Sequence, residues 1–258
     1  MDTISKIIND SLPAKTEELQ ICQYCCKPYT WFEKEFLQGK KIRVQVPTCN
    51  CRELEEQRKE AEKQAQRNKE MLAKKFENSL ITPFFKEKTF NNLKPNAQVQ
   101  KCQIYAKEFD PQKSDGILMI GRPGTGKTSI LAAVCNDLLA RGFNCLFITF
   151  SSLLDKFSQY SYENAGNIST LLNWLVKFDF IVIDDIGREN YTDRRKEIAF
   201  RIVDTLLNYK KVVAFTANPD MIDKLKQIDE WGAILDRLKD ICAMQIKFNG
   251  ESLRGRTW

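Results

Sequence analysis

The sequence predicts an α/β fold in which a mainly parallel five-stranded sheet is flanked by helices, and three patterns support this. Residues 121–128 fit the phosphate-binding loop pattern G-x-x-x-x-G-K-[ST], between a short apolar run and apolar residues at helical spacing. Beyond the loop, apolar runs of strand length alternate with helical patterns, as in parallel sheets with crossover helices. One of these later runs ends in two adjacent aspartates, Asp184 and Asp185. The five predicted strands are residues 117–120, 145–149, 180–183, 212–216 and 242–248.

The phosphate-binding loop predicts how the phosphates of a nucleotide are held. Its glycines, Gly121, Gly124 and Gly126, let the backbone turn so that N–H groups point at phosphate oxygens. Lys127 supplies a charge for the β- and γ-phosphates, and the Thr128 hydroxyl is a ligand for Mg²⁺. A glycine-rich turn before a solvated lysine is the alternative, which the complete motif disfavours. The predicted nucleotide-binding residues are Gly121, Pro123, Gly124, Thr125, Gly126, Lys127, Thr128 and Ser129.

Size and composition limit the class of protein. The chain has 258 residues, of which 43% are hydrophobic, so one large domain or a domain with a small module is expected. No apolar run approaches the length of a transmembrane helix, and residues 1–10 lack the apolar core of a secretory signal. The net charge of +6 is compatible with nucleic-acid binding but is not evidence for it. We therefore expect a cytoplasmic protein without a membrane partner.

Five cysteines in the first fifth of the chain predict a zinc site. Cys22 and Cys25 form a C-x-x-C pair, and Cys49 and Cys51 form a tighter second pair. Because the chain has no histidine, four thiolates would make a closed structural Zn²⁺ site, which can hold together a segment too small for its own core. Cys26 competes with Cys25 for one ligand position, and the spacing favours Cys25. The alternative is a set of free or redox-active thiols.

The remaining cysteines are scattered and mostly lie in apolar surroundings, which predicts small core residues. The total of nine is odd, and no export signal is present. Both features argue for a reducing compartment and against a disulfide framework. The four scattered residues are Cys102, Cys135, Cys145 and Cys242.

The chain divides into three predicted parts. These are a zinc-binding module over residues 1–55, a helical linker over residues 56–88 and a nucleotide-binding domain over residues 89–258. Residues 1–20 are expected to form a helical or loose lead-in. Residues 52–80 are rich in Glu, Lys, Gln and Arg without Gly or Pro, which predicts a solvated connector helix rather than a coiled coil.

Helices separate the predicted strands of the third part. An irregular stretch over residues 81–95 leads into it. Ser151 or Ser152 is expected to cap the helix after the second strand, and Thr192 or Asp193 the helix after the third, whose apolar residues share one face. The other helical patterns are assigned from spacing alone. The predicted helices include residues 97–109, 151–160, 167–177 and 231–239.

Polar side chains at the ends of two strands complete the predicted nucleotide site. Asp184 is placed to hold Mg²⁺, and its neighbour Asp185 is a candidate to orient or activate the attacking water. Asn218 follows the next strand and can hydrogen-bond a water or the γ-phosphate. Arg237 and Arg254 are candidate sensors of phosphate charge, although a single surface arginine is usually only solvated. Two adjacent aspartates in a strand-to-loop turn are common and do not by themselves indicate a metal site. The phosphate-binding loop elsewhere in the chain is what favours that interpretation here.

Together these motifs resemble the AAA+ ATPases of the helicase-loader family, which comprises the DnaC and DnaI type loaders, their phage versions and the IstB-type transposition helpers. The resemblance covers residues 90–258 and rests on the segments GRPGTGKT, IVIDDIG, FTAN, LDRL and SLRGR. It implies that ATP and Mg²⁺ are bound, the metal by Thr128 and Asp184. It also implies that Arg237 reaches the ATP of a neighbouring subunit and that Arg254, with Arg256 as the fallback, contacts the γ-phosphate. The cysteine module is similar to the zinc-binding N-terminal region of many phage-type loaders, which is implied to grip the replicative helicase.

Two departures from the wider AAA+ pattern affect the expected activity. Asp185 stands where most AAA+ enzymes carry a catalytic glutamate, which implies slow hydrolysis. The chain ends soon after the last strand, so no C-terminal helical lid is expected, as in the loader group. The resemblance therefore implies a weak ATPase, stimulated by single-stranded DNA or a partner, that acts as a switch more than a motor. The implied catalytic residues are Lys127, Asp184, Asp185, Asn218, Arg237 and Arg254.

The resemblance also implies that residues 151–177 contact single-stranded DNA. Aromatic side chains beside lysines can stack on bases and follow the phosphates. For any one of these residues, a core aromatic or a solvated lysine is at least as good an interpretation. The candidates are Lys156, Phe157, Tyr160, Tyr162 and Lys177.

Three functions remain as hypotheses. The first is an ATP-dependent loader, phage or prophage encoded, that binds the hexameric replicative helicase through its zinc module, self-associates through its ATP sites on single-stranded DNA and is released by hydrolysis. The second is a transposition helper that remodels DNA for a transposase. The third is a nucleotide-locked adapter or helicase inhibitor with negligible turnover. The cysteine module favours the first, Asp185 keeps the third open, and the nucleotide motifs alone do not separate the first two.

Overall fold

The computed structural model describes residues 19–36, 40–187, 192–227, 231–250 and 252. The chain divides into two units, Met1–Asn68 and Lys69–Trp258, with the boundary inside the helix α2 (Cys51–Asn78). The three-part division expected from the sequence has its boundaries after residues 55 and 88, and it stays a prediction. The expected lead-in over residues 1–20 lies outside the described residues except for its last two positions.

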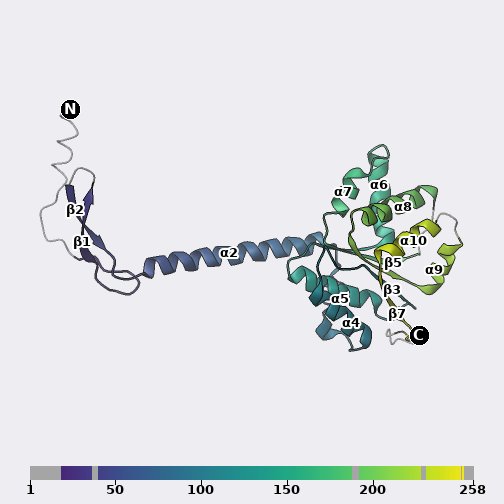
Figure 1. Ribbon diagram of the computed structural model, residues 1–258, viewed down its shortest axis with the longest axis horizontal. Coiled ribbons are helices and arrows are strands. Elements are labelled where there is room, and N and C mark those ends of the chain that lie inside the picture. The colour runs from purple at the N-terminus through teal and green to yellow at the C-terminus, as the bar shows by residue number, and fades with distance from the viewer. Residues whose placement is uncertain (1–18, 37–39, 188–191, 228–230, 251, 253–258) are drawn as a thin grey trace. The chain divides into compact units, whose positions relative to one another are not determined.

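The first unit contains an antiparallel hairpin of β1 (Thr30–Phe36) and β2 (Lys40–Val46) (Figure 1). The register places Phe32 opposite Val44, and the period of two puts Val46 on the same face. Phe32 is 61% exposed, Val44 39% and Val46 38%. The sequence-based prediction contained no strand here, although Val44 and Val46 alternate with polar residues as a half-exposed strand requires.

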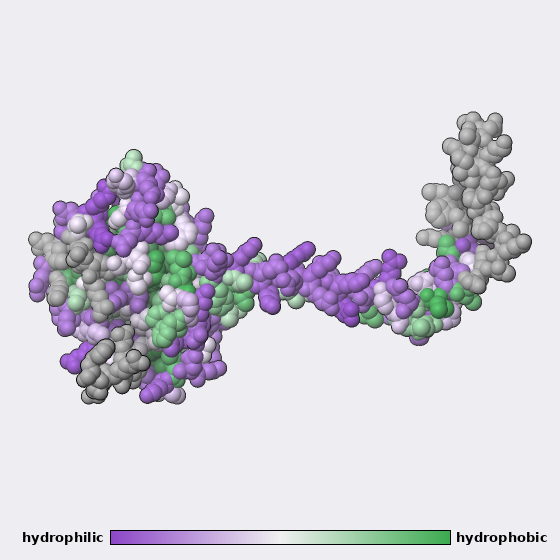
Figure 2. Space-filling model, turned by 180° about the vertical axis from the view of Figure 1, so that it is seen from behind, coloured by the Kyte–Doolittle hydropathy of each residue, from purple (hydrophilic) through white to green (hydrophobic). Residues whose placement is uncertain are grey.

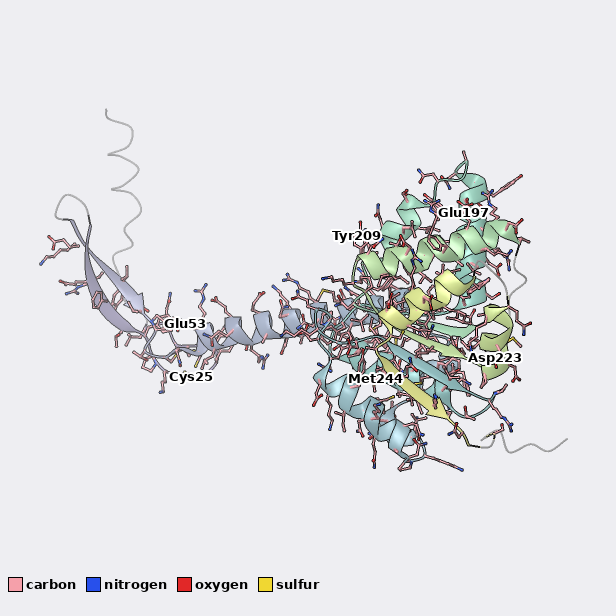
Figure 3. The ribbon with its side chains drawn as sticks, turned by 45° about the vertical axis from the view of Figure 1, so that its right-hand side comes forward. Cys25, Glu53, Glu197, Tyr209, Asp223 and Met244 are labelled. Atoms are coloured by element: carbon pink, nitrogen blue, oxygen red, sulfur yellow. The ribbon has the colours of Figure 1, made fainter. Side chains whose placement is uncertain are left out.

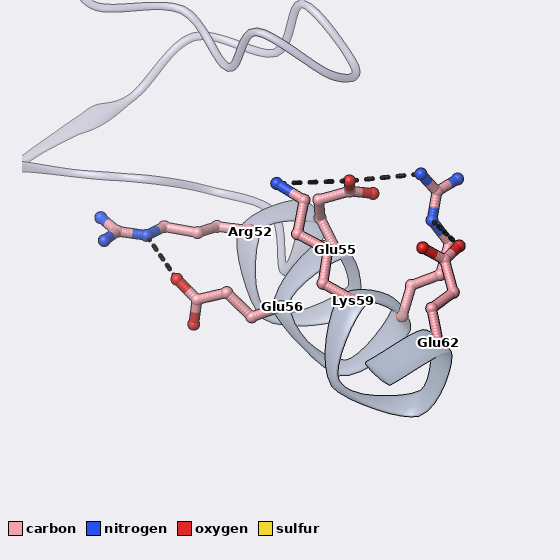
Figure 4. A network of polar contacts seen from close by, with 6 residues as sticks. Arg52, Glu55, Glu56, Lys59 and Glu62 are labelled. Atoms are coloured by element: carbon pink, nitrogen blue, oxygen red, sulfur yellow. Dashed lines mark hydrogen bonds and ion pairs between the residues drawn. The ribbon is translucent and has the colours of Figure 1, made fainter. Parts of the chain in front are cut away.

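The helix α2 confirms the connector helix predicted for residues 52–80. None of its residues, all of which the structure describes, is buried, and its surface is almost entirely polar (Figure 2). Its first turns carry ion pairs three or four residues apart, such as Arg52 with Glu56 at 3.1 Å and Lys59 with Glu55 at 3.7 Å (Figure 4). Each exposed pair of this kind stabilises a helix by only a few tenths of a kcal/mol. Apart from its C-terminal end, where Phe76 packs against the core of the second unit, α2 depends on helix propensity and on the sum of such pairs.

The second unit is built on a parallel sheet with the strand order β4-β5-β6-β3-β7, and the described residues confirm all five predicted strands. The carboxyl ends of parallel strands meet at one edge of a sheet, which is where such folds bind ligands. The strands are β3 (Ile117–Gly121), β4 (Cys145–Thr149), β5 (Phe180–Ile186), β6 (Val212–Ala217) and β7 (Met244–Phe248). The helical elements are α3 (Pro83–Lys86), the short 3₁₀ helix η1 (Phe90–Asn92), α4 (Ala97–Glu108), α5 (Lys127–Ala140), α6 (Phe150–Glu163), α7 (Ser169–Leu175), α8 (Asp193–Asn208), α9 (Pro219–Lys226) and α10 (Trp231–Ile241).

Helices cover both faces of this sheet and bury two apolar layers. The helices α4 and α5 lie on one face, and α6, α8 and α10 lie on the other (Figure 1). Along β5, Phe180 and Val182 belong to the first layer, whereas Ile181 and Ile183 belong to the second. Burial on both faces explains why β3 to β6 are nearly continuous apolar runs, whereas β7 alternates buried and exposed residues.

The helix caps agree only in part with the sequence-based predictions. The cap of α6 is Thr149, whose hydroxyl accepts a hydrogen bond from the Ser152 N–H, so the prediction of Ser151 or Ser152 was wrong. The cap of α8 is Thr192, one of the two predicted candidates. The helix α9 was not predicted.

Among the described residues, no helix combines the length and the apolar character that a membrane span requires. The four scattered cysteines predicted for the core are all buried: Cys102, Cys135, Cys145 and Cys242.

Candidate nucleotide and metal sites

The phosphate-binding loop connects β3 to α5 at the carboxyl edge of the sheet. Gly124 has a φ of 83° and Gly126 a φ of 92°, a left-handed backbone that favours glycine. Gly121 serves a different purpose from the one predicted, because its φ is not in this region. A Cβ at Gly121 would lie 2.5 Å from the Cβ of Phe248, so the close packing of β3 on β7 requires glycine there. The loop is therefore shaped by two turn glycines and one packing glycine.

Lys127 is almost fully buried at the first turn of α5. Its ammonium donates hydrogen bonds to the carbonyls of Gly121 at 2.6 Å and Arg122 at 3.0 Å. It also donates to Oδ1 of Asn218 at 3.3 Å. The predicted phosphate-binding lysine and the predicted polar residue after β6 are thus direct neighbours, although 91 positions separate them in the sequence.

The two acidic residues of β5 accept hydrogen bonds from different partners, Asp184 from hydroxyl groups of the loop and of β6, and Asp185 from the amide of Asn218. The Thr128 hydroxyl donates to Oδ1 of Asp184 at 3.0 Å, and the Thr216 hydroxyl donates to the same oxygen at 2.6 Å. Asn218 donates from Nδ2 to Oδ1 of Asp185 at 3.3 Å. Burial raises the pKa of Asp184 above the usual carboxyl range, and the hydrogen bonds from the two threonines oppose that rise. Hydroxyl and carboxylate oxygens in contact are a fitting donor set for Mg²⁺.

A cleft of about 640 Å³ opens over this cluster, a size within the range of small-molecule sites. Seven of the eight predicted loop residues line it, whereas Gly121 does not. The acidic and polar residues at the strand ends line it as well: Asp184, Asp185, Thr216 and Asn218.

One wall of the cleft was not predicted from the sequence. It comes from the irregular segment before α4 and from the start of that helix, and it includes Phe84, Phe85 and Leu93. Asn136, a buried residue of α5, holds this segment by donating from Nδ2 to the carbonyls of Phe85 at 2.8 Å and Lys88 at 2.7 Å. Apolar side chains in a segment without strand or helix periodicity carry no sequence signal for a binding wall. The remaining residues of this wall are Asn92, Lys94, Asn96 and Val99.

Arg237 is not among the described residues that line the cleft. Its Nε donates to Oδ1 of Asp204 at 3.0 Å, and its guanidinium lies over the ring of Phe200 at 4.4 Å from the centroid. Both partners belong to α8, so the predicted sensor is held at the packing of α10 on α8 within its own chain. The other two candidates, Arg254 and Arg256, lie outside the described residues.

The candidates for single-stranded DNA contact differ in exposure. Phe157 is completely buried in the apolar layer of α6, so it cannot stack on a base and its prediction was wrong. Tyr162, by contrast, is 87% exposed. The Lys156 ammonium lies 5.4 Å from the ring centroid of Trp174, a cation–π contact between α6 and α7. Tyr160 is half-buried and Lys177 is exposed.

The cysteine pairs of the first unit come together. The Sγ atoms of Cys22, Cys25, Cys49 and Cys51 all lie within 4.8 Å of one another, whereas Cys26 is not in the group. Cys25 lies beside the first turn of α2, where Glu53 marks the helix (Figure 3). Four thiols at this separation fit tetrahedral Zn²⁺, whose Zn–S bonds of about 2.3 Å place the sulfurs roughly 4 Å apart.

Hydrogen bonds within the cysteine group lower the pKa of Cys22 and raise the pKa of Cys51. Backbone N–H groups of Tyr24 and Cys25 lower the pKa of Cys22 to about 7. Hydrogen bonds with the crowded thiols of Cys25 and Cys49 raise the pKa of Cys51 to about 12. The raised pKa values of Cys49 and Cys51 thus oppose their ionisation, and a bound divalent cation would supply the charge that favours the thiolates.

Comparisons with known proteins agree with this geometry. The family model described as IstB-like ATP binding protein matches residues 54–258. The chain is 31% identical over 191 residues to the replicative helicase loader DnaC of Escherichia coli strain K12, covering 72% of this chain and 76% of the relative. The second unit resembles two crystal structures in fold. One is titled DnaI, with a TM-score of 0.54, 20% identity and coverage of 68% of this chain and 95% of that one. The other is titled the DnaC helicase loader, with a TM-score of 0.53, 16% identity and coverage of 65% and 100%.

Proposed function

The chain belongs to the family of IstB-like ATP-binding proteins, within the DnaC, DnaI and IstB-like AAA+ group, and on this premise we propose that it is an ATP-dependent loader of a replicative DNA helicase. One observation carries the catalytic part of the proposal: the phosphate-loop residue Thr128 donates a hydrogen bond to Asp184 inside the cleft. The loader part is supported by the 31% identity to a protein named replicative helicase loader DnaC.

The loop and Lys127 bind the phosphates of ATP in this proposal. Backbone N–H groups between Gly124 and Thr128, at the positive end of α5, point to the phosphate oxygens. Lys127 exchanges its bonds to the carbonyls of Gly121 and Arg122 for bonds to the β- and γ-phosphates. The exchange is favoured because an ammonium binds a phosphate oxygen more strongly than a neutral carbonyl.

The strand ends act on the terminal phosphate. When Mg²⁺ is bound, it neutralises part of the phosphate charge that develops during transfer. Thr128 and Asp184 provide its protein ligands. Asp185 orients the attacking water as a general base, and Asn218 fixes Asp185 through the bond at 3.3 Å. Asp185 has a shorter side chain than glutamate, which agrees with a weak ATPase that needs stimulation.

Neighbouring copies complete the site in the proposed assembly. Arg237 leaves Asp204 and contacts the γ-phosphate of the ATP bound to the adjacent subunit. Single-stranded DNA runs along α6 and α7, where Tyr162 stacks on a base and the exposed Lys177 contacts phosphate. The described geometry supports a surface role for these two residues and excludes one for Phe157.

The first unit binds the helicase in this proposal. Its hairpin presents Phe32, Val44 and Val46 to solvent, and exposed apolar groups of this kind are typical of protein interaction sites. The four cysteines hold the segments before and after the hairpin through Zn²⁺. This module and the ATP site then have separate tasks, namely gripping the helicase and timing its release.

Loading onto closed circular single-stranded DNA tests the proposal, because a closed helicase ring cannot thread onto a circle. The full-length chain, a bacterial replicative helicase and ATP are mixed with the circle, and DNA-bound helicase is measured after gel filtration. We expect loading that depends on the chain, and loss of the ATP-dependent part with Lys127→Ala. If the chain forms no complex with the helicase and does not increase loading, it is not a loader.

A transposition helper is the second candidate, because the matching family model itself is described as IstB-like. Bending of duplex DNA without helicase affinity would favour it.

A non-hydrolysing adapter is the third candidate, supported by the short carboxylate of Asp185. Equal background ATPase rates for the wild-type protein and Lys127→Ala, with and without single-stranded DNA, would favour the adapter.

A further inference from the structure

The strand β5 contains one extra residue where it passes β6. Ile183 pairs with Phe215, and the next pairing joins Ile186 to Ala217, so three steps on β5 face two steps on β6. Asp184 and Asp185 therefore both stand opposite Thr216, which is the defining arrangement of a β-bulge. Bulges in parallel pairs are rare, and bulges are frequent beside active sites because they redirect a side chain.

The bulge explains how two consecutive strand residues face one cleft. In a regular strand, Asp184 and Asp185 would point to opposite faces of the sheet. Asp185 instead has a φ of 62°, in the left-handed region that costs an L-residue about 1 kcal/mol. Both carboxylates consequently line the cleft. Something must compensate this strain and the ladder hydrogen bond that the bulge removes.

Thr216 makes contacts with both members of the pair. The Asp185 N–H donates to the Thr216 hydroxyl at 2.8 Å, and the same hydroxyl donates its only proton to Oδ1 of Asp184 at 2.6 Å. Thr216 is 1% exposed, so water cannot readily replace either bond. One hydroxyl thus takes over the hydrogen bond of the bulged backbone and fixes the direction of the first carboxylate.

We propose that Thr216 is a positioning residue for the ATPase reaction, whose hydroxyl holds the β5 bulge so that Asp184 and Asp185 both face the bound nucleotide. The inference rests on the proposed function and deepens it, since it names what orients the two carboxylates. Thr216 acts through its neighbours and transfers no proton to substrate. Serine keeps the donor and the acceptor, whereas valine keeps the shape and has neither.

The experiment compares three variants at this position in the full-length chain: Thr216→Val, Thr216→Ala and Thr216→Ser. The measurements are kcat and KM for ATP, the Mg²⁺ concentration for half-maximal activity, and the affinity for a fluorescent ATP analogue with and without Mg²⁺. The matched control is Thr205→Val on α8, because the Thr205 hydroxyl donates to the Arg201 carbonyl at 2.7 Å, outside the cleft lining.

We expect Thr216→Val to lower kcat about 10²-fold, as misplacement of catalytic groups typically does, and to raise the Mg²⁺ requirement. Affinity for the analogue without Mg²⁺ should change less than about twofold, because the loop is intact. Thr216→Ser should restore most of kcat, and Thr205→Val should match the wild-type protein. If valine fails to fold, alanine gives the same comparison without the added methyl beside the Asp185 N–H.

Three results would overturn the inference. These are an unchanged kcat and Mg²⁺ requirement in Thr216→Val, a serine variant as poor as valine, or an equal loss of Mg²⁺-free affinity, which would indicate a collapsed site. A wild-type protein without turnover would refute the proposed ATPase function instead. In that case the ratio of analogue affinities with and without Mg²⁺ still decides the role of Thr216.

Discussion

The nucleotide cleft and the cysteine module reach their geometry by opposite means. In the second unit, Lys127, Asp184, Thr216 and Asn218 are all buried and hydrogen-bonded above two apolar layers. In the first unit, Cys22 is the only buried residue up to Asn68 among those whose burial the structure describes. The cleft is therefore preorganised by packing, whereas in our proposal the module obtains its order from its four thiols and a bound metal. A site that the folded protein forms by packing keeps its structure when its ligand is lost. A site whose ligand itself stabilises the fold does not.

Removing zinc is expected to have the largest effect and to separate the two units. We expect Cys25→Ser to lose the bound metal, about one Zn²⁺ per chain, together with all helicase binding. A two-stranded hairpin is marginal alone, and the apparent free energy of structural zinc binding is on the order of 10 kcal/mol. ATP binding by the same variant should be unchanged, since no cleft residue belongs to the described part of the first unit.

The matched control for this prediction is Cys26→Ser, which alters the adjacent thiol outside the group of four. Metal analysis and binding to immobilised helicase are measured for both variants. Cys26→Ser should keep both properties. Zinc loss from Cys26→Ser but not from Cys25→Ser would show that the wrong cysteine has been assigned as a ligand.

Arg237 gives the next largest expected effect, because in the proposed assembly it contacts the ATP bound to a second copy of the chain. We expect Arg237→Ala to lower ATP turnover by about 10²-fold or more while ATP affinity stays near that of the wild-type protein. Lys239→Ala is the control on the same helix, since Lys239 pairs only with the exposed Asp236 at 2.7 Å among the ion pairs of the described residues. Steady-state turnover and equilibrium ATP binding are the two measurements.

Mixing variants tests whether Arg237 acts between subunits. Lys127→Ala lacks a working site but keeps its arginine, and Arg237→Ala lacks the arginine but keeps its site. A mixture of these two inactive proteins should recover part of the activity. No recovery at any ratio, under conditions where the wild-type chain self-associates, would place Arg237 in a structural role with Asp204 and Phe200.

The same contrast between packing and exposure decides what the sequence predicts well. The strands β3 to β6 are buried on both faces and are therefore nearly continuous apolar runs, which is why all four were predicted. The strand β7 was also predicted, although it carries the exposed residues Gln245 and Lys247. The hairpin was missed because an exposed strand has only a period of two, and Phe32 at 61% exposure carries no core signal. The two aspartates were recognised, but the bulge that turns Asp185 depends on pairing with β6, 31 positions away. No local pattern contains the role of Thr216 or the bond from Arg237 to Asp204.

The smallest expected effect concerns the wall of the cleft that the sequence did not reveal. Asn136 holds the segment carrying Phe84 and Phe85 through bonds from one amide nitrogen to three backbone carbonyls, those of Phe85, Lys86 and Lys88. Asn136→Leu keeps a similar volume and removes these part-buried hydrogen bonds, at a cost of about 1–3 kcal/mol. The wall should then loosen while the loop and the acidic pair stay in place.

We therefore expect Asn136→Leu to raise KM for ATP several-fold with little change in kcat, and to lower the melting temperature measurably. The pattern is the reverse of that expected for Arg237→Ala, in which turnover falls and binding persists. Asn164→Leu at the end of α6 is the control, because the Asn164 Nδ2 donates to the Tyr160 carbonyl at 2.8 Å, outside the cleft lining. A fall in kcat with unchanged KM would mean that Asn136 supports the phosphate end of α5, and that the aromatic wall does not contribute to nucleotide affinity.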